Sequence, residues 1–329
     1  MKILQQLGSY DRVFELLEHL EDTVELPDHL DGFDSDIDNK ILSAINNQAI
    51  KQDRTYNIIL HTVLDPDVKA QYPRLQFQYR FPTYVFCSLK EYNVHPTLDF
   101  NNFVCSFNGS FHVSRQLLVA ILHKFKWFDF AYCSKNFSFT NDNLSGHIEK
   151  YTGSQQSFYD KFFLTDTTDQ FNQTINSFGF VKTNPHHNQN IYNLESRLTE
   201  SFIHIVSETL ATSYVPFVTE KFLYSVVTRG LFLAYGQPGW HAHLEKYYGF
   251  KSYTKIFDYR FDGIQNPVER VVELMSMLSK FKELTKDDWR SLYLLETDTI
   301  EYNYNHYFSG NYLTHLQTQL QQEGWKWLN

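Results

Sequence analysis

The chain is poor in cysteine, glycine and proline: its 329 residues include 3 Cys, 13 Gly and 9 Pro. Cys87, Cys105 and Cys133 have no CxxC spacing and have apolar or aromatic neighbours, so we expect buried free thiols rather than disulfides or a zinc site. No apolar run reaches the length of a membrane span, and the first residues are too polar for a signal peptide. We therefore expect a soluble, cytoplasmic protein.

The chain also lacks a basic segment, and its formal net charge is −9. Proteins that follow a nucleic-acid backbone usually present a basic face, so nucleic acid is an unlikely partner. The phosphate loop GxxxxGK[ST], the dinucleotide fingerprint GxGxxG and the nucleophile elbow GxSxG are all missing from the sequence. Their absence argues against P-loop kinases, Rossmann dehydrogenases and common serine hydrolases.

What the sequence does contain is an alternation of short apolar runs and amphipathic segments, which predicts an α/β fold. We expect two Rossmann-like lobes with a cleft between them. The predicted parts are a lobe at 1–95, a lobe at 96–310 with a polar insertion at 134–195, and a terminal helix within 311–329 that packs back on the first lobe. The main predicted elements are strands at Met1–Gln5, Tyr56–Leu64, Leu75–Phe81, Thr83–Ser88, Phe100–Phe107, Phe128–Tyr132, Ser201–Ser207 and Leu231–Tyr235, and helices at Asp11–Leu20, Asn39–Asn47, Arg115–Phe125, Thr219–Arg229, Asn266–Lys282 and His315–Trp327.

Two of the predicted helices in the second lobe begin with a cation. Arg115 follows Ser114, a predicted N-cap, and Lys221 follows Thr219. The positive end of a helix dipole disfavours a cation by about 0.3–1 kcal/mol, so a bound anion is needed to offset the repulsion. Helix N-termini bind phosphates, and ligands of open α/β sheets lie at the carboxyl ends of the strands. A diphosphate would satisfy both helices. The alternative is that both cations are solvated surface residues.

Two carboxylates accompany these cations. Glu208 ends the strand Ser201–Ser207, where an acidic side chain can accept hydrogen bonds from ribose hydroxyls. Glu220 directly precedes Lys221 and could do the same, or could simply stabilise the start of the helix.

Three segments in this region resemble α1,3-fucosyltransferases. They are Phe103–Leu122 (FVCSFNGSFHVSRQLLVAIL), Phe202–Glu208 followed by Val218-Thr219-Glu220-Lys221, and Gly230–Gly236 (GLFLAYG). The likeness extends from about residue 100 to 280, interrupted by the insertion.

This resemblance implies a GT-B fold and inverting transfer of a sugar, with a fucose-like donor possible, from a nucleoside diphosphate to a glycan or other hydroxyl acceptor. It implies no metal or other cofactor. Carried over by position, Arg115 and Lys221 would hold the diphosphate and Glu220 the ribose. Glu208 would lie beside the ribose or the sugar, and the resemblance places Asn108 and Thr219 in the same donor site.

Sugar transfer also requires a general base for the acceptor hydroxyl. We expect it in the first lobe, where Asp65 and Asp67 follow the most apolar strand. The same residues can instead form an Asp-Pro-Asp turn.

Two further hypotheses compete. Asp-x-Asp pairs at 34–36, 36–38 and 65–67 are typical of single-lobed, metal-dependent GT-A glycosyltransferases, in which such a pair binds Mn²⁺ or Mg²⁺. A non-catalytic nucleotide- or glycan-binding module would bind the donor without turnover. The pairs His241-x-His243 and His186-His187 lack a third ligand at recognisable spacing, so we expect surface histidines there.

Overall fold

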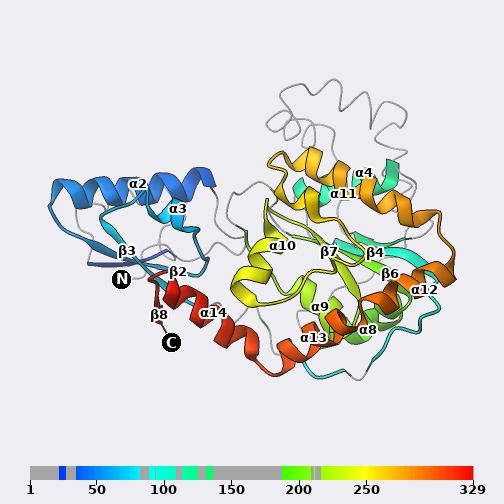
Figure 1. The fold of residues 1–329 in the computed structure, drawn as a ribbon. Coiled ribbons are helices and arrows are strands. Elements are labelled where there is room, and N and C mark those ends of the chain that lie inside the picture. The colour runs from blue at the N-terminus through cyan, green and yellow to red at the C-terminus, as the bar shows by residue number, and fades with distance from the viewer. Residues whose placement is uncertain are drawn as a thin grey trace.

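The computed structural model shows two α/β lobes, each built on a parallel four-stranded sheet (Figure 1). It describes residues 22–26, 35–81, 89–92, 94–108, 113–124, 131–135, 187–208, 211 and 216–328. The predicted α/β class is therefore confirmed. The predicted elements within residues 1–20 and 82–88 lie outside the described residues.

The first lobe contains a sheet with the strand order β1-β2-β3-β8 and helices α2 and α3. Alternation along β2 and β3 places Tyr56, Ile58, Phe77 and Tyr79 on one face, where they are buried. The other face carries polar side chains, and Gln78 donates from Nε2 to Asn57 Oδ1 at 3.1 Å. The elements are β1 (Thr23–Glu25), α2 (Ser35–Lys51), β2 (Tyr56–Leu60), α3 (Pro66–Lys69), β3 (Leu75–Arg80) and β8 (Lys326–Leu328).

The second lobe contains a sheet with the strand order β5-β4-β6-β7. Its strands and their connecting helices are β4 (Asn102–Asn108), α4 (Val113–Lys124), β5 (Ala131–Lys135), α8 (His187–Thr199), β6 (Ser201–Ser207), α9 (Lys221–Val227) and β7 (Leu231–Tyr235). The first crossover, β4 to β5, runs outward on one side, whereas β6 to β7 runs outward on the other. Right-handed crossovers in opposite directions place their helices on opposite faces of the sheet. Accordingly α4 packs against α11, while α8 and α9 pack against each other (Figure 1).

The remaining elements follow β7 and return the chain to the first lobe (Figure 1). They are α10 (Trp240–His243), the π-helical turn η4 (Leu244–Tyr248), the 3₁₀ turn η5 (Tyr259–Gly263), α11 (Pro267–Lys282), α12 (Lys286–Leu295), α13 (Thr297–Phe308) and α14 (Asn311–Gln322). Helix α14 packs on η4, and β8 then pairs in parallel with β3. The last residues of the chain therefore complete the first sheet.

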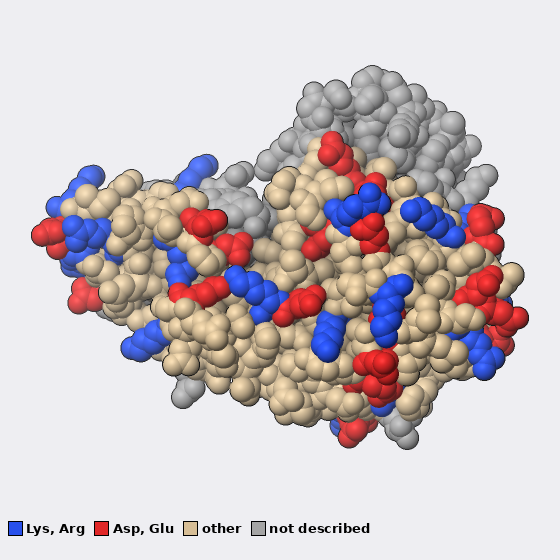
Figure 2. Space-filling view, in the orientation of Figure 1, with Lys and Arg blue, Asp and Glu red and all other residues tan. Residues whose placement is uncertain are grey.

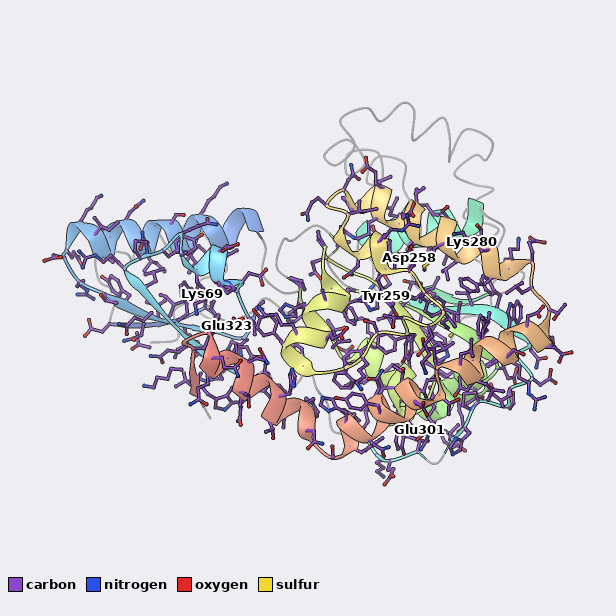
Figure 3. The ribbon with its side chains drawn as sticks, viewed as in Figure 1. Lys69, Asp258, Tyr259, Lys280, Glu301 and Glu323 are labelled. Atoms are coloured by element: carbon purple, nitrogen blue, oxygen red, sulfur yellow. The ribbon has the colours of Figure 1, made fainter. Side chains whose placement is uncertain are left out.

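A polar cluster marks the junction of the lobes. Lys69 of α3 donates to the backbone oxygen of Glu323 at 2.9 Å, and the two residues lie side by side in Figure 3. The Glu323 carboxylate contacts Lys246 Nζ at 2.7 Å and accepts from the Tyr247 hydroxyl at 3.0 Å. Residues of η4, which follows the carboxyl end of β7, thus meet α3, which follows the carboxyl end of β2. The carboxyl ends of both sheets face this junction.

Much of the aromatic content is core. The ring of Trp289 stacks on Phe202 with centroids 5.7 Å apart and on Phe103 with centroids 5.4 Å apart. Phe222 contacts Trp240 and Phe250 edge-on in the same lobe. Burial of large rings contributes both hydrophobic free energy and ring–ring attraction. These rings are therefore used for packing and not for stacking on bases or sugars.

Several boundaries differ from prediction for local reasons. Helix α4 begins at Val113, so Ser114 lies inside the first turn and is not the N-cap. The predicted terminal helix ends at Gln322, and Gly324, at φ +74°, turns the chain into β8. Part of the predicted insertion forms the start of α8, and β1 lies within an acidic stretch that shows no strand pattern. Helix α11 matches its prediction, with the Asn266 side chain capping two N–H groups.

No helix in the described ranges has the length and apolar character needed to cross a bilayer. On the face shown in Figure 2, Lys and Arg side chains alternate with Asp and Glu and do not form a basic stripe.

Candidate functional site

The second sheet has a topological switch point between β4 and β6, because the connections leave these neighbouring strands in opposite directions. In open α/β sheets the ligand lies outside the carboxyl ends of the strands at such a point. Asn108 is the last residue of β4, and Glu208 directly follows β6. Arg115 lies in the first turn of α4, and Lys221 is the first residue of α9. The predicted donor residues thus surround one junction of strands.

Glu208 organises the β6 side of this junction. Its side chain is 1% exposed and accepts hydrogen bonds from the Thr219 backbone N–H at 3.1 Å and from the Thr219 hydroxyl at 2.6 Å. Gly236 packs so closely against it that an added Cβ would lie 3.3 Å from Glu208 Cγ and 2.7 Å from a ring carbon of Trp240. Glu208 therefore fixes the segment that leads into α9.

Burial raises the pKa of Glu208. The nearby charge of Lys221 and the two hydrogen bonds from Thr219 act in the opposite direction, but the desolvation of the carboxylate is larger. A carboxyl group with a raised pKa in a ligand-binding position is typical of functional sites, although structural networks show it too.

Lys221 lies above this carboxylate with its side chain 23% exposed. Its ammonium donates to Thr219 Oγ1 at 2.9 Å, whereas the carboxylates of Glu220 and Glu208 are at 3.6 and 3.9 Å. An ammonium has three donors, and the contact with Thr219 uses one of them. The others can reach an anion, with the two carboxylates holding the cation in place. Glu220 is 24% exposed and precedes the helix without forming a side-chain cap.

The β4 side of the junction is more deeply buried. Asn108 is fully buried and donates from Nδ2 to Ser106 Oγ at 2.9 Å. Arg115 is 3% exposed, so the alternative of a solvated surface cation is wrong for this residue. Because α4 and α9 lie on opposite faces of the sheet, Arg115 and Lys221 belong to the first turns of helices on opposite faces.

Two sets of hydrogen bonds, referred to as braces, hold backbone groups of the segment after β6. Arg270, 1% exposed, donates to backbone oxygens of Ala211 and Ile264. Gln237 Oε1 accepts from the Phe217 N–H at 3.3 Å, and the Phe217 oxygen accepts from Trp240 Nε1 at 3.3 Å. The sequence showed neither brace, because Ala211 and Phe217 lie 20 or more residues away from the side chains that hold them, and pairs this distant leave no local pattern.

The two predicted general bases differ in their surroundings. Asp65, at the N-cap position of α3, is half-buried, and its pKa is raised by burial, with Lys246 opposing and Glu323 and Asp67 adding to the shift. Asp67 is exposed in the first turn of α3, where a carboxylate stabilises the helix dipole.

The prediction of surface histidines is wrong for His241 and His243. His241 and His243 are buried, and burial lowers the pKa of each to about 3. His241 Nε2 accepts from the Ala234 backbone N–H at 2.9 Å, which makes it a packing residue beside β7. His186 and the side chain of His187 lie outside the described residues. Within the described ranges no group of three or more His, Cys, Asp or Glu could hold a metal ion.

Cys105 is a buried free thiol, as predicted, and burial raises its pKa to about 12. The side chains of Cys87 and Cys133 lie outside the described residues.

Sequence reasoning missed a second cluster, at the carboxyl edge of the first sheet. Glu25 ends β1, His61 directly follows β2, and Arg80 ends β3. His61 Nε2 lies 3.2 Å from Glu25 Oε1, and Arg80 Nη1 contacts the same oxygen. The available signal was that polar residues lie at the ends of the predicted strands β2 and β3, whereas β1 lies in an acidic stretch without a strand pattern.

Comparisons with known proteins identify no family. No protein-family model matches the chain, and no curated protein matches it. Among solved structures, three α,α-trehalose-phosphate synthases, two of them described as UDP-forming, are similar at low scores. The Burkholderia xenovorans protein has 11% identity and a TM-score of 0.35, with 96% of this chain and 80% of that chain covered. The Burkholderia vietnamiensis protein has 8% identity and a TM-score of 0.39, with 91% of this chain and 67% of that chain covered. The Burkholderia multivorans protein has 11% identity and a TM-score of 0.35, with 98% of this chain and 78% of that chain covered. Likeness this distant carries no functional argument.

Proposed function

We propose that this protein is a glycosyltransferase of the two-lobed GT-B kind. It would transfer a sugar from a nucleoside diphosphate donor to an acceptor hydroxyl. The observation that supports the proposal is that Arg115, Glu220 and Lys221 lie at the starts of α4 and α9, the helices that follow the neighbouring strands β4 and β6. A single-lobed GT-A architecture does not fit two separate parallel sheets whose carboxyl ends face one junction.

Each residue has a role that its chemistry can fulfil. Lys221 and Arg115 would bind the diphosphate and stabilise the negative charge that develops as it departs, which side-chain cations can do without a metal ion. Glu220 would accept hydrogen bonds from the ribose hydroxyls. Glu208 and Thr219 would hold the loop and the Lys221 ammonium in position, because their mutual hydrogen bonds occupy them.

The second lobe would thus bind the donor, and the acceptor would enter from the first lobe. Attack of the acceptor oxygen on the anomeric carbon from the side opposite the diphosphate inverts the configuration of the sugar. The resemblance to α1,3-fucosyltransferases allows a fucose-like donor. The general base then comes from the first lobe, where the sequence indicates Asp65 or Asp67.

A thermal-shift panel tests the donor site. GDP-, UDP- and dTDP-sugars are compared with a CMP-sugar, each with and without EDTA. The CMP-sugar is the matched control because it carries a single phosphate. We expect stabilisation by one class of diphosphate sugar that persists in EDTA. Stabilisation by none of them would refute the proposal, and stabilisation without release of nucleoside diphosphate in the presence of acceptors would indicate a binding module.

A further inference from the structure

The Glu25–His61–Arg80 cluster lies where an acceptor would approach the first lobe. The strand register pairs Glu25 with Ile59, and Ile59 with Gln78. His61 is two residues beyond Ile59, and Arg80 is two residues beyond Gln78. Because side chains alternate along a strand, all three members of the cluster lie on the same face of the sheet. That face is the polar one, opposite the core packed against α2.

The hydrogen bonds orient the imidazole of His61. Its Nε2 faces Glu25 Oε1 at 3.2 Å, and Glu25 is itself held by Arg80. With Nε2 donating to the carboxylate, the lone pair of the neutral ring is on Nδ1. Nδ1 is buried and has no hydrogen-bond partner among the described residues. A buried polar atom without a partner is unfavourable unless another molecule supplies one.

The protonation states favour proton acceptance at neutral pH. Burial lowers the pKa of His61, and Arg80 lowers it further, while Glu25 opposes this, so the free imidazole is neutral. Burial would raise the pKa of Glu25, but its contacts with Arg80 and His61 outweigh burial and lower it. An ionised carboxylate on one ring nitrogen stabilises the imidazolium that forms when the other nitrogen takes a proton.

The placement fits the two-lobed arrangement. Asp65, four residues beyond His61, is within electrostatic reach of Lys246 in the second lobe. The edge of the sheet that carries His61 is therefore the edge that faces the second lobe.

On these grounds, and resting on the proposed glycosyltransferase function, we propose that His61 is the general base of the reaction and that Glu25 and Arg80 position it. The acceptor O–H gives its proton to His61 Nδ1 while its oxygen forms a bond to the anomeric carbon. The bond from that carbon to the diphosphate oxygen breaks, and the nucleoside diphosphate leaves with the electron pair. Nδ1 is buried in the substrate-free protein, so the acceptor has to displace whatever covers this atom.

The test compares three variants of the full chain. In His61→Gln the amide can still donate to Glu25 but cannot take up a proton. We expect kcat to fall by at least about 100-fold, the usual scale of general-base catalysis, with donor affinity unchanged. His95→Gln is the matched control, because it makes the same substitution at an exposed histidine, and it should change kcat by less than about threefold. Thermal unfolding of each variant without ligand checks that it folds.

Glu25→Gln tests the positioning role through the pH profile. Loss of the carboxylate charge lowers the pKa of His61 further, so the acid limb of kcat/KM should move to lower pH as kcat falls. A purely structural contact would reduce activity without moving the limb. The wild-type limb should itself lie below the ordinary histidine value of 6.5.

The outcomes separate the two proposals. If the wild type binds no diphosphate sugar, the transferase function and the role of His61 both fail. If the wild type transfers sugar and His61→Gln does so within threefold of it, the role of His61 fails alone. A wild-type acid limb above pH 6.5, or an equal loss of kcat in His95→Gln, would also overturn the role of His61.

Discussion

Glu208 accepts hydrogen bonds from both the backbone N–H and the hydroxyl of Thr219, eleven residues further along the chain. This clamp closes the loop between β6 and α9 and sets the position of Lys221. It places the buried Glu208 carboxylate beneath the partly exposed Lys221 ammonium at the switch point of the sheet. The arrangement links the stability of the loop to the binding of an anion, and both can be measured.

Removal of either donor cation should weaken binding of the nucleotide. For Lys221→Ala and Arg115→Ala we expect a loss of about 1.5–3 kcal/mol in affinity for the nucleoside diphosphate, the scale of a charge-assisted contact. Isothermal titration calorimetry measures it. Arg290→Ala is the control, since it removes an exposed cation from α12 in the same lobe. Affinity unchanged in both site variants would argue against the donor site.

The raised pKa of Glu208 predicts a dependence of stability on pH. The folded protein holds this proton more tightly than the unfolded chain, whose value is near 4.5. The stabilisation is therefore complete below pH 4.5 and is lost as pH rises through the folded-state value. Glu208→Gln removes the effect, so the free energy of unfolding of the wild type should fall relative to the variant as pH rises. The slope is at most about 1.4 kcal/mol per pH unit. The prediction would be contradicted if the free energies of unfolding of the wild type and Glu208→Gln, measured in urea, changed in parallel from pH 4.5 to 8.

Gly230→Ala should destabilise the second lobe. An added Cβ would lie 2.1 Å from the ring of His204, which is fixed by Ser225 Oγ at 2.9 Å and the Leu198 oxygen at 2.7 Å. Overpacking of this kind costs about 1–3 kcal/mol or more, measured by chemical unfolding. Gly263→Ala is the matched control, because nothing lies within 4 Å of its added Cβ, and it should change stability by less than about 0.5 kcal/mol.

Glu323→Ala should destabilise the pairing of β8 with the first sheet. The substitution removes partners from Lys246 and from the Tyr247 hydroxyl at the junction, at a cost of about 1–3 kcal/mol. Hydrogen exchange should accelerate in β8, whose pairing with β3 follows directly after this residue. The control is Glu245→Ala, which removes an exposed carboxylate from η4, the π-helical turn that contains Lys246 and Tyr247. Equal exchange in β8 for both variants would show that the cluster does not anchor the strand.

The sequence by itself determined the elements with strong local patterns. The runs at Ser201–Ser207 and Leu231–Tyr235 form β6 and β7 as predicted, because short segments rich in β-branched and aromatic residues favour buried strands over helices. The cap at Asn266 and the proline after it fix the start of α11. The proximity of Glu208, Thr219 and Lys221 also follows from local order, since all three lie on one strand–loop–helix connection.

Only the tertiary structure decided which residues meet across connections. Glu25, His61 and Arg80 come together because three parallel strands end at one edge, and their separations of 36 and 55 residues leave no trace in a local pattern. The same holds for His241, whose burial depends on an N–H group of β7. Tertiary structure also decides β8, because this partly exposed segment forms a strand only by pairing with the edge of β3. Local periodicity determines which segment becomes a strand or a helix, whereas the order of strands in a sheet determines which side chains share a site.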